Sequence, residues 1–391
     1  MAELATVRGA VLGYLDRGEW CNSIKNLLVR GGAWRTRLGS LDYLLFVGED
    51  NIVPAVDYYT PHRISRSDNW YADTDGSDHV PEIAVGRIVG DDARSLALPI
   101  VASIDDACSP TAFDRSHALL VTGGEGQWEL FTVYTDSIAD ILTGQGTRID
   151  SVHHEYNTDE VNLLRSALAV LGSAWGVWER GRATSLPSEI DSLRHLTARW
   201  NFYDASPHTG IDLPEPPLNI DTLRSLITIS EATLVERLRR NRLGTYRIFP
   251  DATTAWNAGL SAIRARMPDR DIYYWYGHGW YGGWDICTAS GTFGRGRTFI
   301  LSESCLTGRY SGIYGAPESC LGVGAAVFIG ATELSYGAHG VQFFRDYWPR
   351  RSSRPAGLAF KLQKQDLVRI AGDSYTVDEY NFYGDPKFGG E

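Results

Sequence analysis

Two apolar segments restrict the fold of this chain most strongly, because each is followed by a small-residue turn with one reactive side chain. The segment IYYWYG (272–277) precedes His278, and the segment TFILS (298–302) is followed closely by Cys305. Apolar runs of this length are typical of strands buried on both faces of a parallel sheet. Neighbouring parallel strands present the residues at their carboxyl ends side by side. The pattern therefore predicts an α/β sheet that brings His278 and Cys305 together.

His278 and Cys305 have the chemistry of a base and a nucleophile. A thiol beside an imidazole forms a thiolate more readily at neutral pH. Gly277 and Gly279 flank the histidine, so the backbone there can approach a bound molecule closely. The backbone N–H groups of Gly279 and Cys305 are expected to stabilise an oxyanion. The alternative is an inert buried thiol, which is the commoner state of a cysteine after an apolar strand.

Two features of this site stay open at the level of sequence. No third residue that would orient His278 is evident, and several acids, including Asp285, could fill that role. Cys320, in PESCLGVG, is an alternative nucleophile because it is expected near the start of a helix, where the dipole lowers the pKa of a thiol.

The order of these motifs resembles a known family. A His-Gly pair after an aromatic strand, followed after the next strand by an acidic residue, a small residue, Cys and x-x-Gly, is similar to the caspase-like (clan CD) cysteine peptidases. The wider sequence resembles the gingipain-type C25 peptidases over most of the chain except about residues 175–255. Four further stretches carry this resemblance: LDYLLFVGEDNIVPA (41–55), SDNWYADTDGSDHVPEIAVGRI (67–88), LGVGAAVFIGATELSYG (321–337) and YNFYGDP (380–386).

The resemblance implies a fold and an activity. We expect a caspase-like α/β/α sandwich with a mainly parallel sheet and two adjacent α/β subdomains. The implied activity is that of a cysteine endopeptidase, which acts on protein or peptide substrates and needs no cofactor for its chemistry. The family match also assigns the segment around Cys320 to a packing helix behind the site, which favours Cys305 as the nucleophile.

The resemblance points to residues for substrate specificity as well. In the caspase-like fold, the residue two positions before the nucleophile, here Glu303, tends to lie beside the first specificity pocket. A carboxylate there favours Arg, which it can bind with two hydrogen bonds, and then Lys. Tyr336 matches an aromatic pocket wall in gingipain-like enzymes and is expected to stack on a guanidinium. The alternative is that Glu303 pairs with an internal arginine such as Arg297 or Arg309.

An acidic loop in the first third of the chain is a candidate calcium site. Four carboxylates lie within DTDGSDHVPE, and the Gly76 turn would let the backbone curl around a cation. Tyr71 stands where an EF-hand requires its first aspartate, so a true EF-hand is not expected. Relatives in the resembled family bind calcium, whereas the alternative is an acidic surface turn. The candidate ligands are Asp73, Asp75, Asp78 and Glu82.

Composition limits the kinds of partner that we expect and the cellular compartment of the protein. The net charge of −11 disfavours nucleic acid, anionic membranes and acidic substrates as partners. Five scattered cysteines form neither a disulfide framework nor a Cys-x-x-Cys metal site, which favours a reducing compartment. The N-terminal sequence lacks the features of a signal peptide, and no stretch of about 18 apolar residues occurs. We therefore expect a cytoplasmic protein, or a secreted one if a leader has been removed.

Alternating strands and helices divide the chain into two predicted subdomains. The first, residues 1–112, contains the acidic loop within 67–88, and the second, residues 113–391, is the catalytic subdomain. An insertion is expected at about 175–255, and the tail NFYGDPKFGG is expected to end at or near the domain edge. Strands are predicted at 43–48, 83–88, 117–124, 148–156 and 325–332, and helices at 91–107, 129–142 and 159–171.

Two other classes of function fit the same expected fold. One is a catalytically silent binding module, and the other is an interaction platform that acts through the calcium loop. Labelling of Cys305 by an active-site thiol probe would distinguish the enzyme from the silent module. A regulatory partner or a larger parent chain is not readable from these residues.

Overall fold

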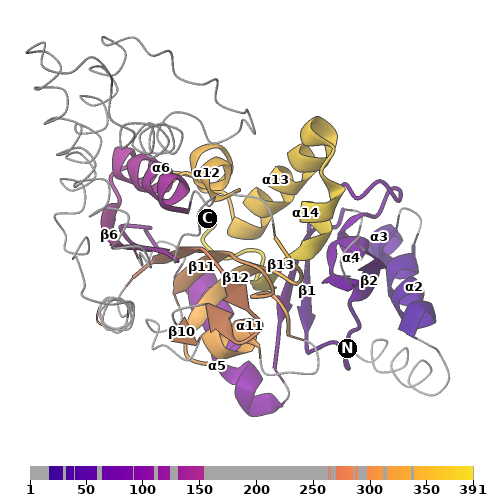
Figure 1. The fold of residues 1–391 in the computed structure, drawn as a ribbon. Helices are drawn as coiled ribbons and strands as arrows, with labels where there is room; N and C mark the ends of the chain where they lie inside the picture. The colour runs from indigo at the N-terminus through magenta and orange to yellow at the C-terminus, as the bar shows by residue number, and fades with distance from the viewer. Residues whose placement is uncertain are drawn as a thin grey trace, which may run out of the picture.

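A computed structural model gives the fold of the chain (Figure 1). It describes residues 17–29, 32–38, 40–59, 64–90, 92–109, 113–123, 131–153, 263, 265, 270–284, 287–288, 297–310, 315–335 and 339–390. The predicted helix at 159–171 and the predicted insertion at 175–255 lie outside the described residues.

An eight-stranded sheet forms the centre of the molecule, in the order β1-β4-β13-β12-β11-β7-β5-β6. Neighbouring strands are parallel except for the pair β12 and β13, so the predicted mainly parallel sheet is confirmed. The strands are β1 (Tyr43–Val47), β4 (Ala84–Ile88), β5 (His117–Thr122), β6 (Arg148–His153), β7 (Ile272–Tyr276), β11 (Thr298–Glu303), β12 (Ala325–Ala331) and β13 (Tyr380–Gly384).

The C-terminal strand β13 lies inside the sheet. It pairs antiparallel with β12 and, through Tyr383 opposite Arg87, parallel with β4. All five residues of β13 are buried, which requires that both faces of the sheet are covered at this strand. Strands from both sides of residue 112 therefore belong to one continuous sheet, and the predicted boundary does not separate two sheets.

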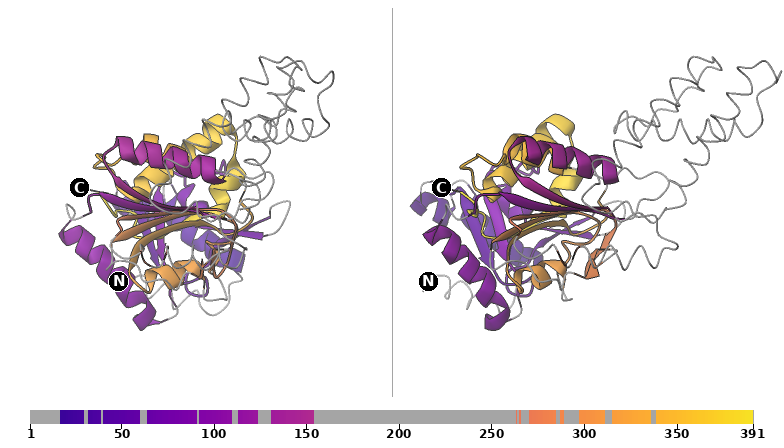
Figure 2. Two further views of the ribbon diagram at one scale, coloured as in Figure 1. Left: turned by 60° about the vertical axis from the view of Figure 1, so that its left-hand side comes forward. Right: turned by 90° about the vertical axis from the view of Figure 1, so that its left-hand side faces the viewer.

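Helices cover both faces of this sheet (Figures 1 and 2). On one face, α6 (Phe131–Gly144) contacts β5 and β6, and α13 (Ala356–Ala371) contacts β4. On the other face lie α5 (Ala93–Cys108) and α11 (Ala316–Leu321), which both contact β12. The structure is thus the expected α/β/α sandwich.

Alternation along the strands builds a separate apolar core on each face. In β7, Ile272 and Tyr274 belong to one buried cluster, whereas Tyr273 and Trp275 belong to the other. Successive side chains of a strand point to opposite faces, so a strand that is apolar throughout must be covered twice. This explains why β7 carries no polar face.

The remaining elements flank the sheet. The N-terminal side carries α2 (Arg17–Leu28), α3 (Ala33–Leu38), α4 (Asn69–Ala72) and the hairpin β2 (Val56–Tyr59) with β3 (Ile64–Ser67). Beyond β7 a small antiparallel sheet contains β8 (Gly279–Trp280), β9 (Gly283–Trp284) and β10 (Cys287–Thr288). After β12 come α12 (Gly340–Gln342), the π-helical turn η3 (Phe343–Tyr347) and α14 (Ser374–Glu379). Within the described ranges, no helix is long and apolar enough to cross a membrane.

Candidate active site

The register of two central strands places His278 beside Cys305. Strands β7 and β11 are parallel neighbours, and Tyr276 lies opposite Glu303 at their carboxyl ends. His278 and Cys305 each follow two residues after this last pair, in the loops that leave the two strands. Adjacent strands are about 4.8 Å apart, so the two loops leave the sheet as direct neighbours. The pairing of β7 and β11 agrees with the expectation that His278 and Cys305 lie at the same edge of the sheet.

Packing between the two loops agrees with this register. A Cβ atom at Gly279 would lie 2.6 Å from both Ser304 Cβ and Thr307 Cγ2, and 3.0 Å from the carbonyl oxygen of Cys305. Only glycine fits so close to the neighbouring turn. The Ser304 hydroxyl also donates to the carbonyl of Gly277 over 2.7 Å. The loop that carries His278 and the turn that carries Cys305 are therefore held together by close packing and a hydrogen bond.

The turn that carries Cys305 has an uncommon backbone conformation. Leu306 has a φ of 61°, in the left-handed region that non-glycine residues rarely adopt. Its N–H donates to the carbonyl of Glu333 over 3.0 Å, and the N–H of Gly308 donates to Ala331 over 2.7 Å. Such conformations persist where surrounding contacts hold them, and they occur frequently at functional sites.

The thiol of Cys305 is half-buried and lies against the segment that follows β12. The backbone N–H of Ser335 donates to Cys305 Sγ over 3.3 Å. Burial raises the pKa of the thiol, while the Ser335 N–H acts to lower it. The Ser335 hydroxyl shares a 2.7 Å hydrogen bond with the Tyr380 hydroxyl, so β13 supports the donor. The Ser335 amide is thus a group that can stabilise a thiolate.

Two fully buried carboxyl groups, Glu333 and Glu379, lie behind this segment. The backbone N–H of Leu334 donates to Glu333 Oε1, and the N–H of Thr332 donates to the carbonyl oxygen of Glu379. Burial raises the pKa of Glu379 to about 9, so this group is neutral at physiological pH. Negative charge on either residue acts to raise the pKa of the Cys305 thiol. A neutral Glu379 therefore favours the thiolate more than an ionised one would.

His278 is exposed and lies beside several aromatic rings. The edge of its imidazole meets Phe131 of α6 at a centroid distance of 5.4 Å. Trp280 and Tyr281, two and three residues further on, are both 41% exposed and contact each other edge to face. These residues form an apolar surface next to the candidate base. Asp285, the suggested orienting acid, lies outside the described residues.

Sequence reasoning missed Ser335, Tyr380, Trp280 and Tyr281 as parts of this site. The aromatic pair follows His278 directly in HGWY, so its proximity could have been noticed. Ser335 and Tyr380 are separated from Cys305 by 30 and 75 residues, and only the strand order brings them together.

Glu303 is buried and already bound by internal donors. Its residue exposure is 2%, and it accepts hydrogen bonds from the Tyr274 hydroxyl and from the backbone N–H groups of His339 and Gly340. These contacts agree with the predicted alternative that Glu303 binds an internal group, but the donors are Tyr274 and the start of α12 instead of an arginine. Burial raises the pKa of Glu303 to about 7.

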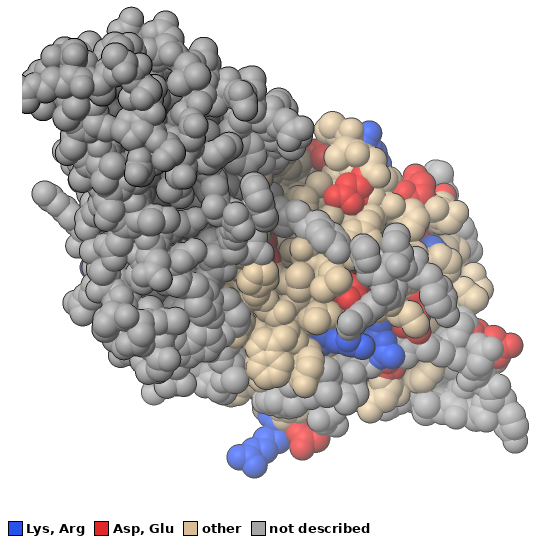
Figure 3. Space-filling model, in the orientation of Figure 1, with Lys and Arg blue, Asp and Glu red and all other residues tan. Residues whose placement is uncertain are grey.

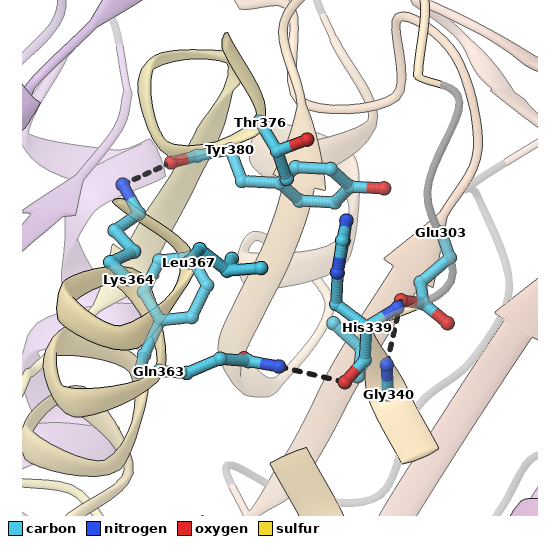
Figure 4. A pocket seen from close by; sticks show the side chains of 10 residues that line it. Glu303, His339, Gly340, Gln363, Lys364, Leu367, Thr376 and Tyr380 are labelled. Atoms are coloured by element: carbon cyan, nitrogen blue, oxygen red, sulfur yellow. Dashed lines mark hydrogen bonds between the residues drawn. The ribbon is translucent and has the colours of Figure 1, made fainter. Parts of the chain in front are cut away.

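Glu303 lines a small pocket between β11, α12, α13 and α14 (Figure 4). The Gln363 amide donates to the carbonyl of His339 over 2.7 Å, and the Lys364 amine donates to the carbonyl of Tyr380 over 2.7 Å. The pocket is lined by Leu301, Glu303, His339, Gly340, Phe360, Gln363, Lys364, Leu367, Thr376 and Tyr380. Tyr336, the other predicted specificity residue, lies outside the described residues.

The acidic loop uses its carboxylates for its own backbone. Asp73 accepts from the N–H of His79 over 3.1 Å, and Glu82 accepts from the N–H groups of Thr74 and Asp75. Asp78 accepts from Val80 over 3.0 Å. In the part of the chain that the structure describes, no three carboxylate, thiol or imidazole groups converge in a way that could hold a metal ion. The four predicted ligands therefore do not converge on one point in this conformation, and calcium binding stays a prediction.

Cys320 is completely buried in the core cluster that also contains Trp284 and Phe328. Its helix α11 packs on β12, as the predicted packing helix would. A reagent or substrate cannot reach this thiol without unfolding. The geometry thus favours Cys305 as the reactive cysteine.

A mainly parallel sheet between two helical layers, with a cysteine and a histidine beyond the carboxyl ends of neighbouring strands, defines a caspase-like α/β fold. Comparison with solved structures agrees. The chain is similar to the crystal structure of the Arg-specific cysteine proteinase gingipain R (RgpB), with a TM-score of 0.54 and 15% identity, over 94% of this chain and 68% of that one. It is equally similar to the complex of Porphyromonas gingivalis RgpB pro- and mature domains, with a TM-score of 0.54 and 14% identity, over 94% and 69%.

The model of peptidase family C25 matches residues 22–178. The family match and the shared fold both agree with the resemblance to the gingipain-type C25 peptidases that was predicted from the motifs. A search of curated protein sequences found no match. The similarity to this family supports a cysteine peptidase.

Proposed function

We propose that this protein is a cysteine endopeptidase in which Cys305 is the nucleophile and His278 the general acid and base. The observation that supports the proposal is the parallel pairing of β7 and β11, because His278 and Cys305 each follow two residues after the last pair of these strands, Tyr276 and Glu303. Cys305 would attack the scissile carbonyl, and His278 would protonate the leaving amine. The histidine would then activate a water molecule that hydrolyses the acyl-enzyme.

Backbone groups around the turn can stabilise the charges that develop in this reaction. The N–H groups of Gly279 and Cys305 are proposed to hold the oxyanion, an interaction worth about 3 kcal/mol per donor in other proteases. The Ser335 N–H, 3.3 Å from the sulfur, would stabilise the attacking thiolate. Because burial raises the pKa of the thiol, the proposal needs these donors and His278 to favour the charged form.

We propose cleavage after Arg, with Lys second. Support comes from the family to which the chain is similar, from the net charge of −11, and from acidic side chains over the region of α13 and α14 (Figure 3). Glu303 can bind a substrate cation only by exchanging its contact with the Tyr274 hydroxyl or with the start of α12. Its raised pKa, about 7, predicts that such binding strengthens above neutral pH, where the carboxylate is ionised.

Cleavage of an unbiased peptide library tests this proposal. We expect cleavage after Arg and then Lys in the wild type, and a loss of this preference in Glu303→Gln. Cys305→Ala should show no cleavage, which controls for a contaminating protease. Cleavage by the wild type after Asp or after large apolar residues would show that other residues form the specificity pocket.

A catalytically silent binding module of the same fold is the second candidate. The raised pKa of the Cys305 thiol favours it, because a thiol that stays protonated at neutral pH is a poor nucleophile. An active-site thiol probe that labels wild-type Cys305 at neutral pH, but not His278→Ala, would exclude the silent module. The RgpB complex contains pro- and mature domains, and we propose that a regulatory segment or partner also acts on this chain.

A further inference from the structure

Helix α5 carries its large apolar side chains on the outside. Its buried positions are Pro99, Ala102 and Asp106, which are small or polar. A surface helix normally buries its large apolar residues against the core. Here four of the ten exposed large hydrophobic residues in the described part of the chain lie on this one helix: Leu98 (49% exposed), Ile100 (36%), Val101 (48%) and Ile104 (55%).

Three of these residues, Ile100, Val101 and Ile104, form a continuous stripe along the helix, and Leu98 lies on its flank. At 100° per residue, Ala97, Ile100, Val101, Ile104 and Cys108 lie within one third of the helix circumference. Figure 2 shows that α5 lies on the outer side of the molecule, with one side against the sheet layer. The inner face anchors the helix, since Asp106 accepts a hydrogen bond from the N–H of Gly389 over 3.1 Å. The stripe is therefore not needed to hold α5 in place.

The charged residues beside the stripe on one copy are complementary to those on a second, antiparallel copy. Arg94 and Asp105 are both exposed and lie on the same flank, near opposite ends of α5. A two-fold axis that relates two antiparallel copies keeps this flank on the same side of both helices. It would therefore bring Arg94 of each copy next to Asp105 of the other, while the two stripes meet at the centre. A parallel two-fold pairing would place the charged flanks of the two copies on opposite sides of the interface, where these residues do not meet.

We propose that α5 is a self-association surface, on which a second copy of this chain packs its own α5 in the antiparallel direction. The stripe is smaller than a standard interface, which buries about 1,600 Å² in total, so the dimer is weak and forms at high protein concentration. Because the stripe lies outside the candidate active site, association leaves Cys305 and His278 accessible. The inference does not depend on the proposed peptidase activity.

Charge variants test both the antiparallel direction of the pairing and the identity of the partner as a second copy of this chain. Arg94→Asp and Asp105→Arg each place two like-charged pairs across the interface, so sedimentation equilibrium should show each variant dimerising at least about tenfold more weakly than the wild type. An equimolar mixture of the two variants should restore association, because every pair between the unlike copies is then complementary. Arg94→Asp puts a negative charge near the N-terminal end of the helix, and Asp105→Arg puts a positive charge near its C-terminal end. Both changes suit the helix dipole, so each variant should fold.

Cross-linking tests the register. The antiparallel arrangement places position 93 of one copy near Cys108 of the other, and both positions are exposed. In a Cys305→Ala background, Ala93→Cys should form an intermolecular disulfide with Cys108 under mild oxidation, and the same variant with Cys108→Ser should not.

Three outcomes would overturn the proposal: a wild type that stays monomeric at all concentrations, a mixture of the charge variants that does not associate, and cross-linking that persists without Cys108. A wild-type monomer whose stripe is protected from solvent would show that another segment of the chain covers α5. Ile104→Glu is a second control for the apolar contact, and it should weaken association without changing the melting temperature.

Discussion

At the scale of single residues, the site depends on groups whose charge is set by burial. Cys305, Glu303 and Glu379 all have raised pKa values, in each case chiefly because burial disfavours the charged form. The sequence shows which residue types stand near the nucleophile, but burial depends on the packing of distant segments. The position of Glu303 two residues before Cys305 could therefore not show whether its side chain is buried or exposed to substrate.

The buried Glu379 should make the stability of the protein depend on pH. Its pKa in the folded protein, about 9, lies above the usual 4.5, so the folded state binds the proton more tightly than the unfolded chain does. The resulting stabilisation is complete below about pH 4.5 and is lost as the pH rises toward 9. We expect Glu379→Gln to flatten the decline of unfolding free energy between pH 5 and 9, as measured by urea denaturation. An equally steep decline in the variant would show that Glu379 is not the titrating group.

At the scale of secondary-structure elements, strand β13 supports the nucleophile turn from the side opposite His278. The Tyr380 hydroxyl is bonded to Ser335, whose N–H reaches Cys305 Sγ. A second tyrosine, Tyr375 of α14, donates to the carbonyl of Leu334 over 2.7 Å. The segment between β12 and α12 is thus held by two hydroxyl groups next to the thiol.

Removing the Tyr380 hydroxyl should make Cys305 less reactive. Tyr380→Phe removes one hydrogen bond worth about 1 kcal/mol, and if that energy holds the Ser335 N–H on the sulfur, the thiolate population at pH 7 falls roughly fivefold. The measurement is the rate of Cys305 alkylation by iodoacetamide as a function of pH. Tyr347→Phe is the matched control, because it removes a tyrosine hydrogen bond to Asp366 elsewhere in the protein. Identical pH profiles for wild type and Tyr380→Phe would contradict this role.

The sequence predicted the regular elements well where the pattern was local. The expected strand at 43–48 is β1, the expected helix at 91–107 is α5, and the expected strand at 325–332 is β12. The spacing of apolar residues and the residues that cap helices, such as Asp92 at the start of α5, can be recognised within a short stretch of sequence. The place of β13 was missed because strand order depends on pairing between residues far apart in the chain, which no local pattern records.

At the scale of the whole molecule, one sheet joins the two predicted subdomains. β13, from the C-terminal end, pairs with β4 of the N-terminal part and with β12 beside the nucleophile. The candidate active site and the acidic loop are therefore parts of one continuous framework. His79 of that loop pairs with Asp378 of α14 over 2.6 Å, only two residues before Tyr380.

Calcium should not stabilise the protein through the acidic loop. Its carboxylates do not converge on one point, and Asp73, Asp78 and Glu82 each hold the loop in this shape through a backbone hydrogen bond, so a bound ion would require the loop to rearrange. We expect the same melting temperature in excess calcium and in chelator. A rise in calcium that disappears in Asp73→Asn would restore the calcium site predicted from the sequence, because a ligand that binds only the folded state raises its stability.

The central claim is that Cys305 and His278 act together as nucleophile and base, and peptidase activity in three single variants tests it most directly. Cys305→Ala and His278→Ala should each abolish cleavage of an Arg-containing peptide while the far-ultraviolet circular dichroism and the melting temperature stay close to those of the wild type. Cys320→Ala, which changes a completely buried thiol away from the site, should remain active even if it is less stable. Activity that survives in Cys305→Ala and is lost in folded Cys320→Ala would contradict the account.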